Sequence, residues 1–319
     1  MQGGVAALVV TRARPAYDGP VGAQLIDGKA VSAQIRAELA VQAAKLREAG
    51  VVPGLAVILI GEDPASQSYV KAKARASAEI GIRGDVHRLE GTDVPAEIEA
   101  KTRALIETLN ADPAVDGIIV QLPLPDGVDA EALLRAIDPR KDVDGLHPEN
   151  QGYLLQGAPR FLPATPHGVQ QLLVRTGNDP GGKHVVIAGR SKLVGMPLAA
   201  MLLQKRAGAN ATVTVCHTGT PDLALHTQQA EILVAAMGRP DGITAEMVRP
   251  GAVVIDVGVN RVDDESRARG YRLVGDVDFE SVRAKASFIT PVPGGVGPMT
   301  VTMLLTNVVR AARERRAVR

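Results

Sequence analysis

The chain has 319 residues, of which 45 % are hydrophobic, so its length allows one large domain or two modest ones with packed cores. It carries 36 Lys and Arg against 35 Asp and Glu, a balance that gives no general attraction to nucleic acid or to a membrane surface. The single cysteine, Cys216, excludes an intramolecular disulfide and a cysteine-cluster metal site, and the six His show no metal-binding spacing. We therefore expect a globular, cytoplasmic protein with no metal and with no nucleic-acid or membrane partner.

The first part of the chain has an unusual composition. Residues 1–23 contain Arg12 and Arg14 and no acidic residue before Asp18. A targeting peptide has a similar bias, but the apolar run is short and no cleavage site is clear. We therefore predict that residues 1–23 form a disordered N-terminal extension, with a targeting peptide as the alternative.

From residue 31 onward, apolar runs alternate with helical stretches. In chain order, the pattern predicts a helix at 31–50, a buried strand at 55–60, a helix from 64, a short strand near 85–90, a helix at 95–112 and a strand at 116–121. Repeats of strand, helix and strand at this spacing are typical of parallel βα units. Such strands are buried on both faces and so read as continuous apolar runs.

The stretch from Leu122 to Thr165 is punctuated by Pro and Gly, and we interpret it as an interdomain linker. A second α/β series follows, with strands predicted at 184–189, 212–217, 231–236 and 252–258, a helix from about 197 and a closing helix from about 301. The sequence therefore predicts an α/β protein with two α/β domains that flank a cleft.

Polar side chains are expected at one edge of the first sheet. Tyr69 and Lys73 lie four residues apart after the strand at 55–60, so they share a helix face, and Gln121 ends the strand at 116–121. Ligands bind at the carboxyl ends of strands in open α/β sheets, and a partly buried Lys can lose its proton near neutral pH. The alternatives are a solvated basic helix face and a glutamine that caps a loop.

Two carboxylates follow in a Gly-containing turn. Asp142 and Asp144 both belong to the segment 141–148, and an Asx turn is a common alternative role for Asp before Gly. Each of these signals is weak alone, whereas the Tyr–Lys pair, the glutamine and the two acids together favour a catalytic cleft.

A second set of residues has features of a nucleotide-binding turn. A strand ends at Gly189, and Pro197 lies near the first turn of the next helix, whose free N–H groups suit a pyrophosphate. The spacing is not the regular G-x-G-x-x-G. The next strand ends without the acid that holds the ribose in NAD enzymes, so Arg190 and Thr218 are candidates to meet a 2′-phosphate. This favours NADP, with a surface Arg in an ordinary loop as the alternative.

The segment 291–300, PVPGGVGPMT, has three Pro and three Gly in ten residues. No GK[ST] follows, so it is not a phosphate-binding Walker A loop. Its rigid, glycine-exposed backbone suits close approach to a flat ligand, and an interdomain hinge is the alternative.

Taken together, these motifs resemble the bifunctional methylenetetrahydrofolate dehydrogenase/methenyltetrahydrofolate cyclohydrolase family. The resemblance runs from about residue 24 to the C-terminus and rests on IDGK (26–29), GEDPASQSYVKAK (61–73), DGIIVQLPLP (116–125), KDVDGLHP (141–148), PATPHG (163–168), GRSKLVGMP (189–197), VIDVGVNR (254–261) and ITPVPGGVGPMT (289–300). It implies NADP-dependent oxidation of 5,10-methylenetetrahydrofolate, followed by hydrolysis of the methenyl product to 10-formyltetrahydrofolate.

The resemblance also implies an architecture. Residues 24–160 and 297–319 would form a folate-binding catalytic domain, and residues 161–296 a Rossmann-like NADP-binding domain. The C-terminal helix would return to the first domain, and two chains would associate as a homodimer through the cofactor domain.

On the folate side, the resemblance assigns catalytic roles to four residues. Lys73 matches the catalytic lysine, and Gln121 matches the glutamine that hydrogen-bonds that lysine and tunes it. Asp144 matches the carboxylate that grips the pterin, and Tyr69 matches the tyrosine that stacks near the folate. The implied substrate-binding set is Tyr69, Asp144, Pro293 and Gly294.

On the cofactor side, the resemblance assigns Gly189, Arg190 and Ser191 to the nucleotide turn. Val259 matches a position on the nicotinamide side. Thr218 stands where the family commonly has Ser, so a hydroxyl is kept and NADP remains favoured.

Two rival functions stay open at this point. A different two-domain NADP-linked dehydrogenase, such as an amino-acid dehydrogenase, would not explain VQLPLP together with KDVDG. A catalytically inactive folate- or nucleotide-binding protein is the other, and retention of Tyr69, Lys73, Gln121 and Asp144 argues against it.

Overall fold

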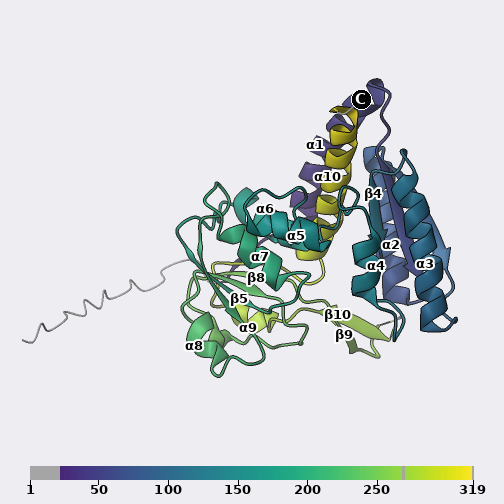
Figure 1. Cartoon of the computed structure of the whole chain (residues 1–319). Coiled ribbons are helices and arrows are strands. Elements are labelled where there is room, and N and C mark those ends of the chain that lie inside the picture. The colour runs from purple at the N-terminus through teal and green to yellow at the C-terminus, as the bar shows by residue number, and fades with distance from the viewer. Residues whose placement is uncertain (1–21, 268–269, 318–319) are drawn as a thin grey trace, which may run out of the picture.

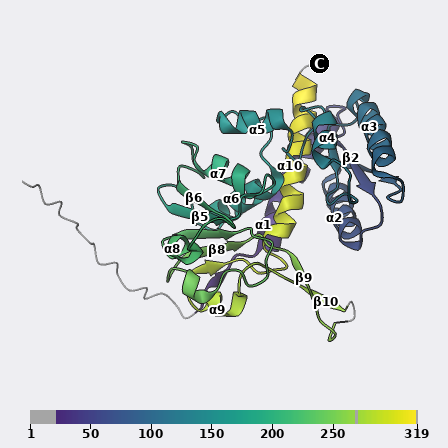
Figure 2. The ribbon, with the colours of Figure 1, turned by 60° about the horizontal axis from the view of Figure 1, so that its bottom comes forward.

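The structure is a computed structural model that describes residues 22–267 and 270–317. Two α/β domains lie on either side of the long helices α1 (Gly28–Glu48) and α10 (Val296–Ala317), which pack against each other (Figures 1 and 2). The α/β class and the two-domain plan predicted from the sequence are confirmed. Residues 1–21 of the predicted N-terminal extension lie outside the described part of the chain. Among the described residues, no helix is long and apolar enough to cross a membrane.

The first domain is built on a three-stranded parallel sheet in the order β3–β2–β4. Its strands are β2 (Gly54–Ile60), β3 (Arg83–Leu89) and β4 (Gly117–Val120), and its helices are α2 (Pro64–Ile80), α3 (Pro95–Ala111) and α4 (Ala130–Ala136). The central strand β2 is buried along its whole length, which explains its unbroken apolar sequence. Because α2 follows β2, it begins at the carboxyl edge of the sheet.

Local sequence sets where α2 begins and ends. The Asp63 carboxylate caps the helix by accepting a hydrogen bond from Ser66 N at 2.7 Å, and Pro64 occupies the first turn. The helix stops at Gly81, whose φ of 82° lies in the left-handed region that glycine adopts without strain. Lys73 lies on the buried face of this helix, among small and apolar side chains, so it points into the protein.

The second domain contains a six-stranded, all-parallel sheet in the order β1–β11–β8–β7–β5–β6. Its strands are β1 (Gln24–Leu25), β5 (His184–Ala188), β6 (Thr212–Cys216), β7 (Ile232–Ala235), β8 (Val253–Asp256) and β11 (Phe288–Ile289). The other elements are α6 (Ala164–Arg175), α7 (Gly195–Leu202), α8 (Leu223–Thr227), the 3₁₀ helix η1 (Ala245–Met247) and α9 (Phe279–Arg283). A hairpin of β9 (Asn260–Asp263) and β10 (Tyr271–Val274) extends from this sheet toward the first domain (Figure 1).

Two regions differ from the sequence expectation. Residues 24 and 25, placed in the first domain by the resemblance, pair with β11 in the second sheet, and Ala23 N donates a hydrogen bond to Arg283 O at 2.7 Å. Residues 122–165 are more than a linker, because they contain α4 and α5 (Pro148–Leu155). Their Pro and Gly residues form the turns that flank these short helices.

The C-terminal helix α10 packs on the first domain, as predicted. Its Asn307 Nδ2 donates hydrogen bonds to Val143 O at 2.8 Å and to Leu162 O at 2.9 Å. Near the end of the helix, Arg315 Nε lies 2.7 Å from the Asp116 carboxylate. Since α10 also packs along α6, one helix fixes the first domain against the second.

Candidate active site

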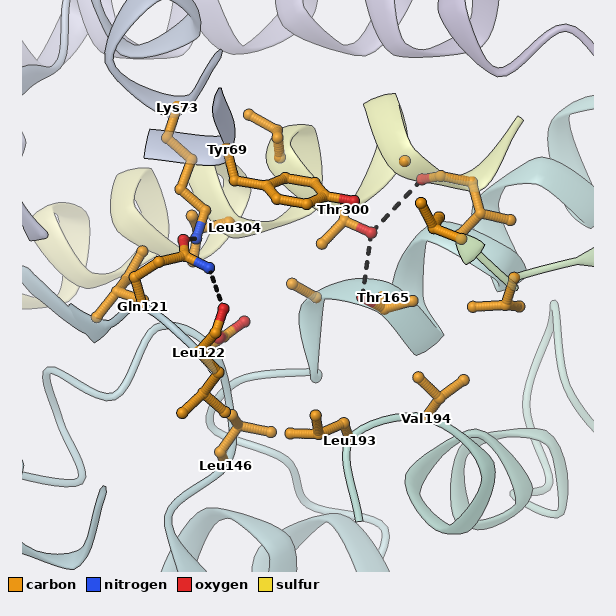
Figure 3. A pocket seen from close by; sticks show the side chains of 18 of the residues that line it. Tyr69, Lys73, Gln121, Leu122, Leu146, Thr165, Leu193, Val194, Thr300 and Leu304 are labelled. Carbon is orange, nitrogen blue, oxygen red and sulfur yellow. Dashed lines mark hydrogen bonds between the residues drawn. The ribbon is translucent and has the colours of Figure 1, made fainter. Parts of the chain in front are cut away.

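A cavity of about 320 Å³ lies between the two domains, at the carboxyl edges of their sheets (Figure 3). The structure brings five of the predicted site residues together in its wall: Tyr69, Lys73, Gln121, Asp144 and Val259. The first four come from the first domain, whereas Val259 follows β8 of the second. The cavity is therefore built from both domains.

Lys73 and Gln121 form a buried pair. Lys73 Nζ donates a hydrogen bond to Gln121 Oε1 at 2.9 Å, and each residue is 8 % exposed. Gln121 Nε2 in turn donates to Leu122 O at 2.6 Å (Figure 3). Because the amide nitrogen is held by this carbonyl, the amide oxygen faces the lysine.

The charges of Lys73 and Asp144 are set by two opposing effects. Burial lowers the pKa of Lys73, while the nearby Asp144 carboxylate acts in the other direction. Burial raises the pKa of Asp144. The nearby positive charge of Lys73 lowers this pKa, and the negative charge of Asp142 raises it. A lysine with a lowered pKa can exchange protons nearer neutral pH.

The two acids of the 141–148 segment have different surroundings. The buried Asp142 carboxylate accepts hydrogen bonds from Leu146 N at 3.2 Å, His147 N at 2.7 Å and Asn150 Nδ2 at 2.8 Å, so it organises the turn. Within the part of the chain that the structure describes, the Asp144 carboxylate accepts no hydrogen bond, and it faces the cavity. The turn interpretation therefore describes Asp142, whereas Asp144 is available to a ligand.

Tyr69 is among the residues that line both this cavity and a larger one. Its side chain is 38 % exposed and lines both spaces, and partial burial raises the pKa of its hydroxyl. The second cavity, of about 1260 Å³, contains the predicted residues Pro293 and Gly294. These two residues thus share a cavity with Tyr69 but not with Lys73.

The remaining predicted residues lie at the ends of β5 and β6. Gly189 has a φ of 136°, and a Cβ there would lie 2.0 Å from Ala236 O, so only glycine fits this turn. Arg190, Ser191 and Thr218 are exposed, and none of the four lines the cavity around Lys73. They form a separate surface at the same edge of the sheet.

The turn after β5 fits a dinucleotide. Gly195 starts α7 so close to the preceding strand that a Cβ would lie 2.0 Å from Gly189 O. At the N-terminus of α7, Val194 N and Met196 N already donate hydrogen bonds to Ser191, each at 3.1 Å, and residue 197 is a proline without an N–H group. Gly195 N is therefore the backbone donor of this turn that remains available to an anion. Beyond the turn, Leu193 and Val194 reach the wall of the cavity opposite Lys73 (Figure 3).

Sequence reasoning missed several residues of the cavity wall. Thr165 and Thr300 lie side by side in it, with their hydroxyls hydrogen-bonded at 3.1 Å, and they join α6 to α10 (Figure 3). Leu193 and Val194 are two further omissions. All four lie inside motifs noted in the sequence, so their position in those segments was the available signal.

Family models match both domains of the chain. The tetrahydrofolate dehydrogenase/cyclohydrolase catalytic domain matches residues 26–144, and the NAD(P)-binding domain of the same enzymes matches residues 163–316. The chain belongs to the tetrahydrofolate dehydrogenase/cyclohydrolase family. The resemblance inferred from the sequence motifs is confirmed.

Individual members of the tetrahydrofolate dehydrogenase/cyclohydrolase family are similar over nearly the whole chain. The bifunctional protein FolD of Syntrophus aciditrophicus is 53 % identical over 293 residues, which cover 92 % of this chain and 98 % of that protein. The crystal structure of the bifunctional FolD enzyme of Campylobacter jejuni superposes with a TM-score of 0.84 at 48 % identity, covering 92 % of this chain and 99 % of that one. The FolD structure of Trypanosoma brucei, complexed with NADP and an inhibitor, gives a TM-score of 0.86 at 41 % identity and covers 93 % and 99 %.

Proposed function

We propose that the chain oxidises 5,10-methylenetetrahydrofolate with NADP⁺ and hydrolyses the resulting methenyl compound to 10-formyltetrahydrofolate. The observation that carries this proposal is the hydrogen-bonded Lys73–Gln121 pair beside Asp144, in a cavity whose opposite wall comes from the nucleotide-binding turn. The folate that donates the hydride and the cofactor that accepts it could therefore meet in one cavity. Family membership and the similarity to bifunctional FolD proteins support it.

For hydrolysis, the proposal gives Lys73 the proton transfers. In its neutral form, Lys73 donates one N–H to Gln121 Oε1, which leaves its lone pair free to accept a proton from the attacking water. Burial favours this neutral form by lowering the pKa of Lys73. The water oxygen forms a bond to the methenyl carbon, and the bond from that carbon to N5 then breaks. N5 takes the second proton of the water, and the proton held by Lys73 passes to solvent as 10-formyltetrahydrofolate leaves.

Binding and orientation are assigned to the neighbouring residues. Asp144 accepts hydrogen bonds from the amino and ring N–H groups of the pterin, and Tyr69 stacks on the aromatic part of the folate, whose outer end reaches Pro293 and Gly294. When bound, NADP⁺ supplies the hydride acceptor. Gly189 and Ser191 hold its pyrophosphate, Arg190 and Thr218 its 2′-phosphate, and Val259 its nicotinamide side.

Both activities can be separated in one assay of the purified chain. The chain is mixed with 5,10-methylenetetrahydrofolate and NADP⁺ or NAD⁺, and reduced cofactor, methenyl and 10-formyl products are followed. We expect reduction of NADP⁺ with conversion through to the 10-formyl product. Methenyl accumulation above a buffer control would refute the hydrolytic role, and reduction of neither cofactor would favour a folate-binding protein without catalysis.

The Lys73→Ala variant tests the proposed residue directly. Hydrolysis should fall by at least about 10²-fold, and at least as severely as oxidation, because no other group in the cavity replaces the amine. Wild-type hydrolysis in this variant would contradict the role of Lys73.

We also propose how the chain is organised in solution. Residues 26–160 with α10 bind folate, and residues 161–295 with β1 bind NADP. The family matches to residues 26–144 and 163–316 support the two parts, and the contacts of α10 with Val143 and of β1 with β11 support where these two elements belong. A homodimer through the second domain is supported by its edge strand β6, whose Val215 is 36 % exposed, and by Leu203 at the end of α7, which is 59 % exposed. The free thiol of Cys216 supports a cytoplasmic location. Sedimentation velocity of the full chain at several concentrations tests the dimer.

A further inference from the structure

Two buried carboxylates at the carboxyl edge of the second sheet have no role in the proposed chemistry. Asp256, at the end of β8, is 4 % exposed, and Asp276, ahead of α9, is fully buried. The Asp256 carboxylate accepts three backbone hydrogen bonds, from Gly258 N at 2.9 Å, Asp276 N at 2.9 Å and Val277 N at 3.0 Å. It therefore holds the loop after β8 against the segment that precedes α9.

Asp276 extends the same arrangement to the neighbouring strand. Its carboxylate accepts hydrogen bonds from Met237 N at 2.5 Å, Gly238 N at 3.0 Å and Arg239 N at 2.9 Å, all in the loop after β7. It also accepts one from Asn260 Nδ2 at 2.8 Å, at the start of β9. Through this pair of acids, the loops after β7 and β8 and the base of the β9–β10 hairpin are fixed to one another.

The backbone approaches both acids so closely that side chains are excluded. A Cβ on Gly258 would lie 2.2 Å from Asp276 Oδ1, and a Cβ on Gly275 would lie 1.8 Å from Asp256 Oδ2. Both contacts are far shorter than van der Waals distance. The glycines in DVGVN and VGDV thus allow the N–H groups to converge on the carboxylates.

The loop that these acids hold forms part of the reaction cavity. Val257 and Val259 line the cavity around Lys73, and Val259 presents an apolar side chain that is 46 % exposed. Neither Asp256 nor Asp276 lines that cavity. Asp256 lines the larger cavity, whereas Asp276 lines neither, so Asp276 can influence the reaction only through the backbone that it positions.

We propose that Asp256 and Asp276 are positioning residues for the oxidation step, because they fix the Val257–Val259 wall that would hold the nicotinamide side of bound NADP⁺. This inference rests on the proposed function. The residues that hydrolyse the methenyl compound come from the first domain, so hydrolysis depends much less on the position of this wall. The two activities should therefore respond differently when the acids are changed.

The chemistry of the site requires a carboxylate at position 276. Both oxygens accept hydrogen bonds, two at Oδ2 and two at Oδ1. The Asp276→Asn side chain has nearly the same shape, but its NH₂ group would face N–H donors and could accept nothing. At least one loop must then move away.

The test compares oxidation and hydrolysis in the same Asp276→Asn preparation. We expect kcat/KM for NADP⁺ in oxidation to fall about tenfold or more, with a raised KM for NADP⁺, since small displacements of a reacting group are costly. Hydrolysis of added methenyltetrahydrofolate, which needs no cofactor, should change less than about twofold. Asn260→Ala, which removes a single donor to Asp276, should show the same split more weakly and is used if Asp276→Asn does not fold.

Asp116→Asn is the matched control. Asp116 is also a buried carboxylate that accepts a backbone hydrogen bond, from Gly54 N at 2.8 Å, but it lies in the first domain away from the cavity. Its variant should lower the melting temperature and leave the ratio of the two activities unchanged. Equal loss of both activities in Asp276→Asn or Asn260→Ala, or loss of neither in folded protein, would overturn the inference. Absence of oxidation in the unmodified chain would instead overturn the proposed function.

Discussion

At the scale of single residues, Lys73 lies where burial and a neighbouring acid act on its pKa in opposite directions. Burial lowers that pKa and Asp144 raises it. If neutral Lys73 is the base, the hydrolysis rate rises as the pH increases through the pKa of this residue. The surroundings of one side chain thus set the pH range of the reaction.

Replacing Asp144 by Asn removes the opposing charge, so the pKa of Lys73 falls further. We expect the midpoint of kcat for hydrolysis to move to lower pH by about one unit, measured at saturating methenyltetrahydrofolate. Asp126→Asn, an exposed change on the nearby loop, is the control and should leave the midpoint in place. A midpoint that stays fixed or rises in Asp144→Asn would contradict the pairing.

Arg190 is the residue that should separate the two cofactors. It is exposed beside Gly189, where a guanidinium can pair with a 2′-phosphate. In Arg190→Ala, the KM for NADP⁺ should rise about tenfold and the KM for NAD⁺ less than about twofold, as initial rates would show. Arg313→Ala, on the exposed side of α10, should change neither, and equal shifts for both cofactors in Arg190→Ala would reject the contact.

At the scale of elements, α10 holds the turn that presents Asp144. Asn307 supplies hydrogen bonds to the carbonyl groups of Val143 and Leu162, which Leu at this position cannot. Asn307→Leu should therefore lower the free energy of unfolding by about 2 kcal/mol and weaken folate binding, measured by urea titration and by calorimetry. Thr306→Ala is the control, because it removes only a hydrogen bond within the helix, to Thr302 O. Its free energy of unfolding should fall by about 0.5 kcal/mol. A similar small effect of Asn307→Leu would mean that the turn is held by other contacts.

At the scale of the whole molecule, two ion pairs connect distant parts of the chain with different burial. Asp116 is buried, and its partner Arg315 on α10 has a side chain that is 24 % exposed. Arg315→Leu leaves a buried carboxylate without its partner and should reduce the free energy of unfolding by about 2 kcal/mol at neutral pH. The Glu38–Arg175 pair between α1 and α6 is more exposed, so Glu38→Gln should cost less than about 1 kcal/mol. If urea titration gave the same small loss of unfolding free energy for Arg315→Leu as for Glu38→Gln, α10 would not be anchored by Asp116.

Much of this architecture follows from local sequence. The cap at Asp63 and the stop at Gly81 define α2, and the apolar run of β2 marks a strand buried on both faces. These signals depend on neighbours in the chain, so they can be recognised without the fold. The order of the motifs and the family resemblance can also be recognised from the sequence alone.

Other features depend on contacts between remote segments. The two-residue strand β1 pairs with β11, more than 260 positions later, and nothing near residue 24 encodes that partner. Likewise, α4 and α5 are short helices whose Pro and Gly surroundings resemble a linker. Such elements are stabilised by what they pack against more than by their own propensity.

The sequence by itself determined the residue types of the candidate site, the strand ends on which they stand and the family to which the chain belongs. Only the tertiary structure decided that Lys73 meets Gln121, that Asp142 builds the turn while Asp144 faces the cavity, and that two further acids hold the loop after β8. The physical reason is that caps and periodicity act over a few residues. Burial, hydrogen-bond partners and pKa are instead set by segments that only the folded chain brings together.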